Sequence, residues 1–395
     1  MLTPFEHSNH VAKHNIPEKL ELWTAATSGQ TITPRVDFPA QYAGRVYWQI
    51  SDGALKPATS GAEINHTFTA NGSHRVRLIG VPINQITYLS ASSDYISQDI
   101  SAFPIHKYRS LATLFLSSTS VSGDISGWTL PNSLRYLYLH STSVSGDISG
   151  WTLPNSMTTL FLSSTSVSGD ISGWTLPNSL GYLSLHSTSV SGDISGWTLP
   201  ASLVRLYLHS TSVSGDISGW TLPASLASLY LSSTSVSGDI SGWTLPNSLG
   251  YLSLHSTSVS GDISGWTLPN SMTTLFLYST SVTVASTFAG VGTGMRDFRI
   301  QDCGLSAAHV GNVVESIWNA RAGFTYATPV LNVGGMNAAP AGNVIAPIEG
   351  ADWHDDSGTW IPLTAGAMIW DLAKDVNSEG FKKWTVTYNG GVASP

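Results

Sequence analysis

The sequence predicts a mainly β protein. Its central part is expected to be a solenoid with one parallel strand per turn, preceded by a small β-sandwich and followed by an end with some α-helix. The first observation is the string Gly-Asp-Ile-Ser-Gly-Trp-Thr-Leu-Pro, which occurs seven times at a constant spacing of 23 residues, beginning at Gly123, Gly146, Gly169, Gly192, Gly215, Gly238 and Gly261. The second is a short alternating apolar segment before each copy. Self-similarity at one fixed period is typical of stacked repeat proteins.

Each repeat alternates its apolar residues in a way that suits a turn of a solenoid. In Leu134-Arg-Tyr-Leu137-Tyr-Leu139 the last two leucines alternate as a half-buried strand requires. Ile148 and Leu153 then return the chain to the core. One turn cannot bury its apolar side alone, so stacking of turns makes the core continuous. We therefore expect the apolar places of every turn to be buried, for example Leu114, Leu116, Val121, Ile125 and Leu130.

This pattern resembles the leucine-rich repeat, L-x-x-L-x-L-x-x-N/T-x-L, and its Ser-Gly-x-Ile half is similar to the plant-type variant. The resemblance implies a solenoid whose strands form a concave sheet. Two positions depart from the motif. Thr142 and its equivalents replace the usual Asn, and Ser149 replaces the Pro of the plant-type motif.

Three parts are expected along the chain. Residues 1–85 resemble a PKD-like, immunoglobulin-type β domain, on segments such as Trp48-Gln-Ile50-Ser-Asp52-Gly53. Within this part, Asn71-Gly72 between two alternating segments predicts a hairpin turn. Residues 86–294 form the solenoid of near-identical turns, beginning with a divergent turn at Ile86.

Residues 295–395 are expected to form an irregular leucine-rich-repeat cap with helices and a loop insertion. Ser306 is a plausible N-cap for a helix that places Val310, Val313, Val314 and Ile317 on one face. Strands are expected at 330–333 and 384–388, with a second helix at 364–379. This ending resembles the terminal turns of bacterial and phage leucine-rich-repeat proteins.

Composition disfavours several classes of protein. Charged residues are 11% of the chain, the net charge is −8 and no Lys/Arg cluster occurs, which disfavours a nucleic-acid partner. The single cysteine, Cys303, cannot form an internal disulfide. The N-terminus has no signal-peptide pattern and no segment is long and apolar enough for membrane insertion. We expect a virion or a cell exterior reached after assembly as the location, with the cytoplasm as the alternative.

The repeats differ from one another mainly along the strand segment. Substitutions concentrate at its second, third, fifth and seventh places, and the last three of these point out of the sheet. The exposed-looking places of Ser122, Asp124, Ser126 and Thr129 stay fixed in all seven copies. We interpret the variable places as a ligand-binding face made of Tyr136, Tyr138, Tyr182, Arg205, Tyr207, Tyr230, Tyr251, His140, His186, His209 and His255. Surface drift, or recombination among a few strand cassettes, is the alternative.

Two columns of identical residues have structural interpretations. The aspartates equivalent to Asp124 would stack, and Asp beside Gly in a turn usually accepts hydrogen bonds from nearby amides, which we favour over a calcium ladder. The tryptophans from Trp128 to Trp266 would stack and stiffen the side away from the sheet, with an exposed strip for lateral assembly as the alternative.

Metal, ice and catalytic sites are disfavoured. His186 and His209 on neighbouring turns lack further ligands, so we expect no metal. Thr119 and its equivalents would point inward, which argues against an ice-binding threonine array. Asp352, His354, Asp355 and Asp356 could make a small metal site or a solvated loop. No catalytic motif occurs, and neither an enzyme nor a cofactor is expected.

These observations predict a recognition or adhesion protein that binds a glycan or protein surface through the concave face. A phage tail or virion receptor-binding subunit would suit this chain, with residues 1–85 available for self-association or for contact with virion proteins. The alternative is a structural subunit of an extracellular filament or surface layer.

Overall fold

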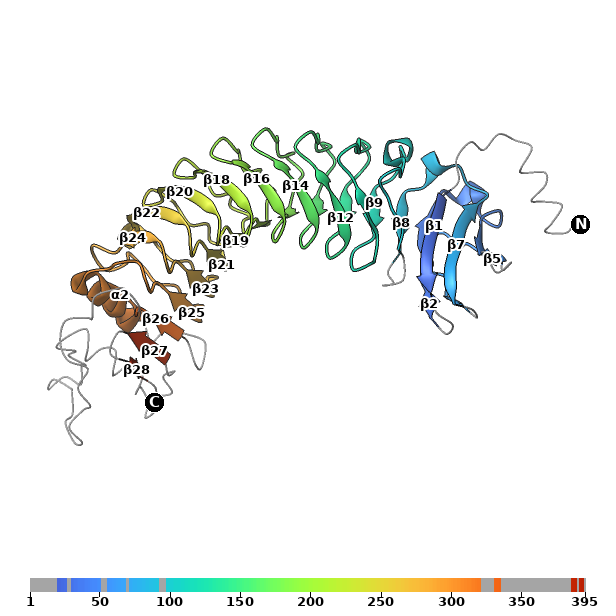
Figure 1. Cartoon of the computed structure of the whole chain (residues 1–395). Coiled ribbons are helices and arrows are strands. Elements are labelled where there is room, and N and C mark those ends of the chain that lie inside the picture. The colour runs from blue at the N-terminus through green and yellow to red at the C-terminus, as the bar shows by residue number, and fades with distance from the viewer. Residues whose placement is uncertain are drawn as a thin grey trace, which may run out of the picture. The chain divides into compact units, whose positions relative to one another are not determined.

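The computed structural model describes residues 20–26, 30–50, 55–68, 71–91, 97–320, 330–334, 385–388 and 391–393. The chain divides into two compact units, residues 1–191 and residues 192–395, which are described separately below. Figure 1 labels the elements of both units.

The first unit begins with antiparallel β structure. A four-stranded sheet has the order β1 (Leu20–Ala26), β7 (Gly72–Ile79), β4 (Tyr47–Ile50) and β5 (Leu55–Pro57), and β2 (Thr31–Ile32) pairs separately with β6 (His66–Thr67). Short 3-10 helices cover Ala40–Tyr42 and Ile83–Gln85. Trp48, Ile50, Phe68 and Val76 are buried in this region. The β structure that the sequence predicts for this region is therefore present, while its PKD-like character and its standing as a separate domain stay predictions.

The predicted Asn71-Gly72 hairpin is wrong. Asn71 precedes β7 and Gly72 is its first residue, but β7 does not pair with β6, the strand before it. Strand β6 pairs with β2, whereas β7 pairs with β1 and β4. The chain thus passes from one sheet to another at a place where a tight turn between paired strands was expected.

The antiparallel region also supplies an edge strand to the repeats. Strand β3 (Arg35–Asp37) pairs antiparallel with β8 (Tyr88–Ser90), and β8 pairs parallel with β9 (Thr113–Phe115). The amide of Thr87 also donates to the carbonyl of Asp37, at 3.0 Å. An uncovered edge would offer free backbone groups to other chains, and β3 covers it. The predicted division at residue 85 therefore falls between strands that share one sheet.

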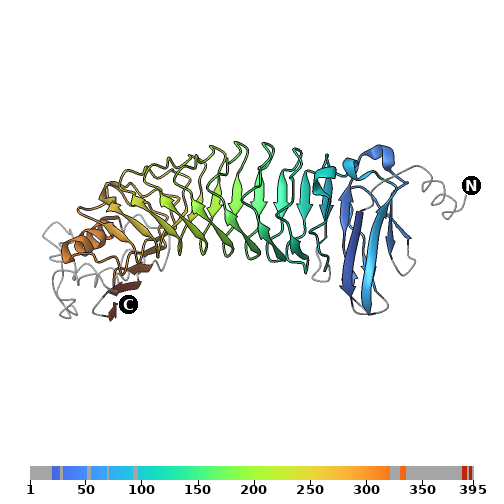
Figure 2. The same ribbon diagram turned by 45° about the horizontal axis from the view of Figure 1, so that its top comes forward.

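The repeats of the first unit form a main sheet of parallel strands. After β8 and β9 it continues through β11 (Tyr136–Tyr138), β13 (Thr159–Phe161) and β15 (Tyr182–Ser184). Each residue pairs with the residue one repeat later, so that Leu114, Leu137 and Leu160 lie in register. Figure 2 shows these strands side by side. The predicted parallel strand in each turn is confirmed.

A second ladder runs along the same turns and was not predicted. It begins with β10 (Ser122–Asp124), β12 (Ser143–Asp147), β14 (Ser166–Asp170) and β16 (Ser189–Asp193), all parallel, and the first unit ends within β16. The Ser-Val-Ser-Gly-Asp segment has only one buried apolar residue, Val144 in β12, so its sequence carries little strand signal.

The second unit continues both kinds of ladder. Its main sheet has the order β17 (Arg205–Tyr207), β19 (Ser228–Tyr230), β21 (Tyr251–Ser253), β23 (Thr274–Phe276), β25 (Asp297–Arg299), β26 (Val330–Asn332), β27 (Thr385–Tyr388) and β28 (Gly391–Ala393). Only the last pair, β27 with β28, is antiparallel. Its second ladder contains β18 (Ser212–Asp216), β20 (Ser235–Asp239), β22 (Ser258–Asp262) and β24 (Ser281–Thr283).

Helix α2 (Ala307–Ala320) follows β25 as predicted. The Ser306 hydroxyl accepts the backbone N–H of His309 at 3.2 Å, which confirms Ser306 as the N-cap. One face of the helix is fully buried, through Val310, Val313, Val314 and Ile317. The predicted strands at 330–333 and 384–388 are also present, as β26 and β27. The predicted helix at 364–379 lies outside the described residues.

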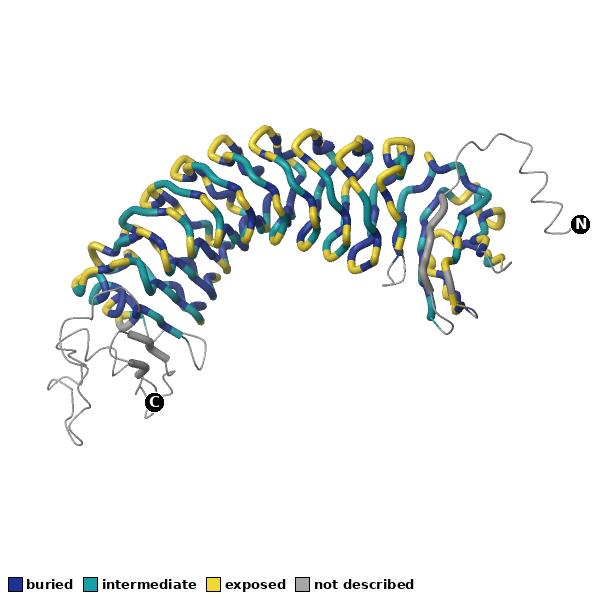
Figure 3. Tube along the Cα trace, viewed as in Figure 1, coloured by how far each residue is buried: buried dark blue, intermediate teal, exposed yellow. Residues whose placement is uncertain are grey.

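The core follows the repeat. Leu114, Leu116, Val121, Ile125 and Leu130 are all buried, as predicted, and so are their equivalents in the six later copies of the repeat. Figure 3 shows these buried positions recurring along the turns. Thr119 in the place of the usual Asn is also buried, and its hydroxyl donates to the carbonyl of Leu116 at 2.6 Å. A threonine therefore satisfies the backbone where the motif has an amide side chain.

The tryptophans are structural. In the first unit the rings of Trp128 and Trp151 lie 6.4 Å apart with planes 2° from parallel, and both are buried. The indole N–H of Trp151 donates to the carbonyl of Ile125 in the preceding turn, at 3.3 Å. In the second unit Trp243 and Trp266 repeat this arrangement at 6.5 Å. Their burial contradicts the alternative of an exposed tryptophan strip.

Candidate functional site

The variable places of the repeats lie on the outward side of the main sheets, which we call the strand face. In β11, Leu137 is fully buried while Tyr136 and Tyr138 on either side of it are partly exposed. The same alternation holds in β17, where Leu206 is buried between Arg205, which is exposed, and Tyr207, which is partly exposed. The third and fifth places therefore point away from the core.

In the first unit, aromatic rings gather around Tyr138. Its ring lies 5.1 Å from that of Phe115 and 5.3 Å from that of Phe161, and the Tyr136 ring is parallel to it at 6.5 Å. His140 contacts both Tyr138 and Phe161 edge-on. Of the predicted residues, Tyr136, Tyr138 and His140 thus come together. Tyr182 is in register with Thr159 on the next strand, and His186 follows that strand.

In the second unit, three tyrosines form what we call the tyrosine cluster, Tyr207, Tyr230 and Tyr251. Tyr207 and Tyr230 meet edge-on, with centroids 4.8 Å apart. Tyr230 and Tyr251 lie 5.8 Å apart with planes 21° from parallel. His209 borders Tyr230 at 5.7 Å. These four predicted residues therefore form one connected surface.

His255 belongs to a different group in the second unit. Its ring stacks on that of Tyr278, at 4.1 Å and 9° from parallel, and lies 6.4 Å from that of Phe276. The Arg299 guanidinium lies 4.8 Å above the Phe276 ring and forms a bidentate pair with Asp297. We call this the histidine–arginine cluster. Sequence reasoning placed His255 beside the tyrosines, whereas its ring contacts in the structure are with these later residues.

Several members of these clusters were missing from the predicted site. The sequence signal for them was available, because all of them occupy the fifth or seventh variable place of a strand segment: Phe115, Phe161, Phe276, Tyr278 and Arg299. Choosing only tyrosine, histidine and arginine within the seven regular copies excluded the phenylalanines, together with Tyr278 of the eighth turn and Arg299 of the ninth.

Burial shifts the pKa values of several tyrosines and histidines on the strand face further towards the neutral forms. It raises the pKa of Tyr230 to about 12 and also raises the pKa of Tyr138. The pKa values of His140, His186 and His255 are lowered, chiefly by burial. These groups are therefore neutral at pH 7. Across residues 111–282 the formal positive charges are only Arg135 and Arg205.

The aspartate column has the role predicted for it. Asp147 Oδ1 accepts the backbone N–H of Ser149 at 2.8 Å, and the same bond recurs in other turns, for example from Ser218 to Asp216. These bonds from serine lower the pKa of both carboxyls. Ser149 in the place of the plant-type Pro supplies the amide for this turn. Within the part of the chain that the structure describes, no group of three or more His, Cys, Asp or Glu side chains could hold a metal ion.

Two groups of residues that were weighed as possible metal sites are not tested. His186 and His209 belong to different units, so their separation is not described. Asp352, His354, Asp355 and Asp356 lie outside the described residues.

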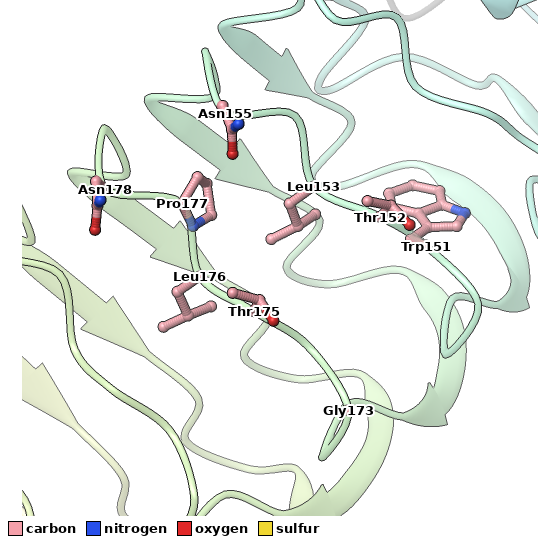
Figure 4. Close-up of a pocket in the computed structure, with 9 residues that line it drawn as sticks. All are labelled: Trp151, Thr152, Leu153, Asn155, Gly173, Thr175, Leu176, Pro177 and Asn178. Carbon is pink, nitrogen blue, oxygen red and sulfur yellow. The ribbon is translucent and has the colours of Figure 1, made fainter.

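The first unit also contains a shallow groove of about 310 Å³ between two consecutive turns. Figure 4 shows Leu153, Leu176 and Pro177 along it, with the side chains of Asn155 and Asn178 at one end. Trp151, Thr152, Gly173 and Thr175 complete the lining. All of these residues are uncharged, and none was among the predicted site residues.

A family model described as "Mycoplasma protein of unknown function, DUF285" matches residues 82–174. No curated protein matches the sequence. A plant ice-binding protein is 22% identical, with a TM-score of 0.34, over 48% of this chain and 62% of its own. An internalin from Listeria monocytogenes is 17% identical, with a TM-score of 0.36, over 61% and 72%. The plant peptide hormone receptor RGFR1 in complex with RGF2 is 18% identical, with a TM-score of 0.31, over 59% and 45%.

The chain thus spans less than two thirds of the ice-binding protein and of the hormone receptor. Likeness at these values carries no argument about ligand or activity. The strand pairing, the period and the buried leucines define a leucine-rich-repeat solenoid in their own right.

Proposed function

We propose that this chain is a non-enzymatic recognition protein that binds a protein or glycan surface through the strand face. One observation carries the proposal. Near-identical repeats differ mainly at the outward places of the strand segment, where the larger side chains are partly exposed and form clusters of neutral aromatic rings. Tyrosine supplies a large contact area with a polar end and is enriched at binding hot spots.

The broader setting belongs to the same proposal. We place the protein on a virion or cell exterior, for example as a receptor-binding subunit of a phage tail, with residues 1–85 attaching it to its own assembly. The part of the chain covered by the structure has no helix of the length and apolarity that crossing a membrane requires. A subunit of a filament or surface layer is the second candidate, favoured by the identical exposed residues of successive turns, such as Thr129 and Thr152.

The test compares two triple variants in attachment to target cells. Replacement of Tyr138, Tyr207 and Tyr230 by Ser should reduce attachment at least tenfold without unfolding, because Ser already occupies this place at Ser184 and Ser253. The control replaces Asp147, Asp193 and Asp239 by Asn, which removes charge but keeps an oxygen that can accept the serine amide. If only the Asp-to-Asn control lost attachment, the binding site would have to be assigned to the turns that contain these aspartates and not to the strand face.

A further inference from the structure

Tyr251 presents an open aromatic surface in the second unit. It is 41% exposed, and among the described residues only Leu55 is a comparably exposed large hydrophobic residue. A single exposed apolar residue needs no explanation by itself. Tyr251 differs because its ring lies beside another ring, that of Tyr230, with the two planes 21° from parallel.

Tyr230, the ring beside Tyr251, is packed against further aromatic rings. Tyr230 is held edge-on by Tyr207 at 4.8 Å and bordered by His209 at 5.7 Å. Ser253, two residues after Tyr251 on the same strand, is 2% exposed. The surface is therefore one exposed ring beside a packed ring, with a small side chain next to it. Such a platform is organised before any ligand arrives, which lowers the entropy cost of binding.

The position of the cluster argues against an extended peptide as its ligand. Strand β21 is paired on both sides, with β19 and with β23, so its backbone groups are used within the sheet. A peptide that adds as a strand needs a free sheet edge, and an amphipathic helix needs an apolar groove. Here recognition must come from the side chains that stand out of the middle of the sheet.

The charge of the cluster favours a neutral ligand. Tyr230 has a pKa of about 12 and keeps its proton at pH 7. Arg205, exposed at the start of β17, is the only formally charged side chain at the outward places of β17, β19 and β21. Tyrosine hydroxyls and a guanidinium are hydrogen-bond donors, and tyrosine hydroxyls also accept. A sugar ring offers the complement, with C–H groups on one face and hydroxyls around its edge.

We infer that Tyr251, supported by Tyr230, is a stacking platform for a neutral sugar ring, with Tyr207 and Arg205 bonding to its hydroxyls. This rests on the proposed function of the strand face and names the ligand class for the second unit: a neutral glycan rather than a protein.

The experiment measures binding of the full chain to four neutral hexasaccharides by isothermal titration calorimetry: cellohexaose, fully N-acetylated chitohexaose, mannohexaose and laminarihexaose. The wild-type protein should bind at least one of them. Tyr251→Ser should weaken that binding about tenfold or more, since truncation of a stacking side chain removes most of its contact. Tyr251→Phe should keep it within about threefold, because the ring remains.

Two controls keep the result interpretable. Ser228 and Thr274 occupy the equivalent place in neighbouring turns, so Tyr251→Ser should fold, which circular dichroism checks. Thr244→Ala changes an exposed residue in the preceding Trp-Thr-Leu-Pro segment and should leave hexasaccharide binding unchanged.

Two results would overturn the inference: a wild-type protein that binds none of the four hexasaccharides, or a folded Tyr251→Ser protein that binds as tightly as wild type. Neither result would refute the strand face as the recognition surface, because the triple tyrosine variant tests that separately by cell attachment. Failure of both tests would remove both proposals.

Discussion

The strand face and the turn face of one repeat are both exposed, yet only one of them varies. We use turn face for the exposed residues of the Gly-Asp-Ile-Ser-Gly-Trp-Thr segments. Asp147 is exposed and constant because it accepts the Ser149 amide, so exposure alone does not predict freedom to change. Tyr138 is half-buried among rings and is replaced by Ser at Ser184. The comparison teaches that an exposed residue of this repeat can be fixed by its backbone contacts, just as the leucines are fixed by burial in the core.

The largest effect should come from Gly169→Ala. Gly169 has φ of 117°, and a Cβ there would come 2.1 Å from Asp147 Oδ1. Strain and overlap together should lower the free energy of unfolding by about 2–4 kcal/mol. Gly173→Ala is the matched control, since a Cβ there meets nothing within 4 Å. Thermal unfolding followed by circular dichroism measures both. Equal losses would refute the distinction between the two glycines.

The second largest effect should be a loss of stability in acid, caused by protonation of the aspartates of the turn face. The pKa of each of its exposed carboxyls is lowered by bonds from the serine two residues on, as for Asp124, Asp147, Asp170, Asp216 and Asp239. Folding therefore gains stability that is fully present above the unfolded pKa of about 3.9 and is lost as pH falls through the folded pKa. Thermal unfolding measured at several pH values between 7 and 2 should therefore show a Tm that decreases as the pH falls below about 3.9.

A variant makes the acid prediction specific. Replacing these aspartates by Asn keeps the acceptor and removes the titration, so the fall in Tm should become smaller. An unchanged acid midpoint in the Asn variant would assign the transition to other carboxyls.

Trp174→Phe should cost about 1–2 kcal/mol. The change removes the indole N–H that donates to the Ile148 carbonyl at 3.2 Å and leaves a space beside a residue that is only 6% exposed. Thr175→Ser, at the exposed neighbouring place, should alter stability by less than about 0.5 kcal/mol. Urea unfolding compares the two. If Trp174→Phe left the free energy of unfolding unchanged, ring stacking alone would account for the stability of the tryptophan column, without the indole hydrogen bond.

The smallest effect should have the opposite sign. Ser164 is exposed and has φ of 54°, a left-handed conformation that disfavours side chains. Ser164→Gly should therefore stabilise the protein by about 0.5 kcal/mol. Ser166→Gly, two residues later in β14, should instead destabilise it by a similar amount, because its backbone is extended. Shifts of the same sign in both variants would contradict this account.

The sequence was most informative where a side chain bonds to the backbone close to its own position in the chain. Thr119 and Ser306 were assigned correctly because each bonds to backbone within its own turn. The second ladder was missed because Ser and Gly dominate its strands. The Asn71-Gly72 hairpin was wrong because the sheet that each strand joins depends on distant partners. The aromatic clusters could be predicted as places on a face, but their ring contacts depend on neighbours 23 residues away.

The close approach of the glycine before each Asp to the Asp of the preceding turn has an evolutionary consequence. Gly146 lies against Asp124 in the same way as Gly169 lies against Asp147, so closely that a Cβ added to either glycine would overlap the carboxylate. Because each copy of the repeat has the same Gly and Asp at this junction, one copy can follow another without any change of the residues that contact it. A duplicated or transplanted repeat brings new residues to the strand face while its junctions stay compatible. Duplication or exchange of whole repeats can therefore change the residues of the strand face during evolution while the fold is kept.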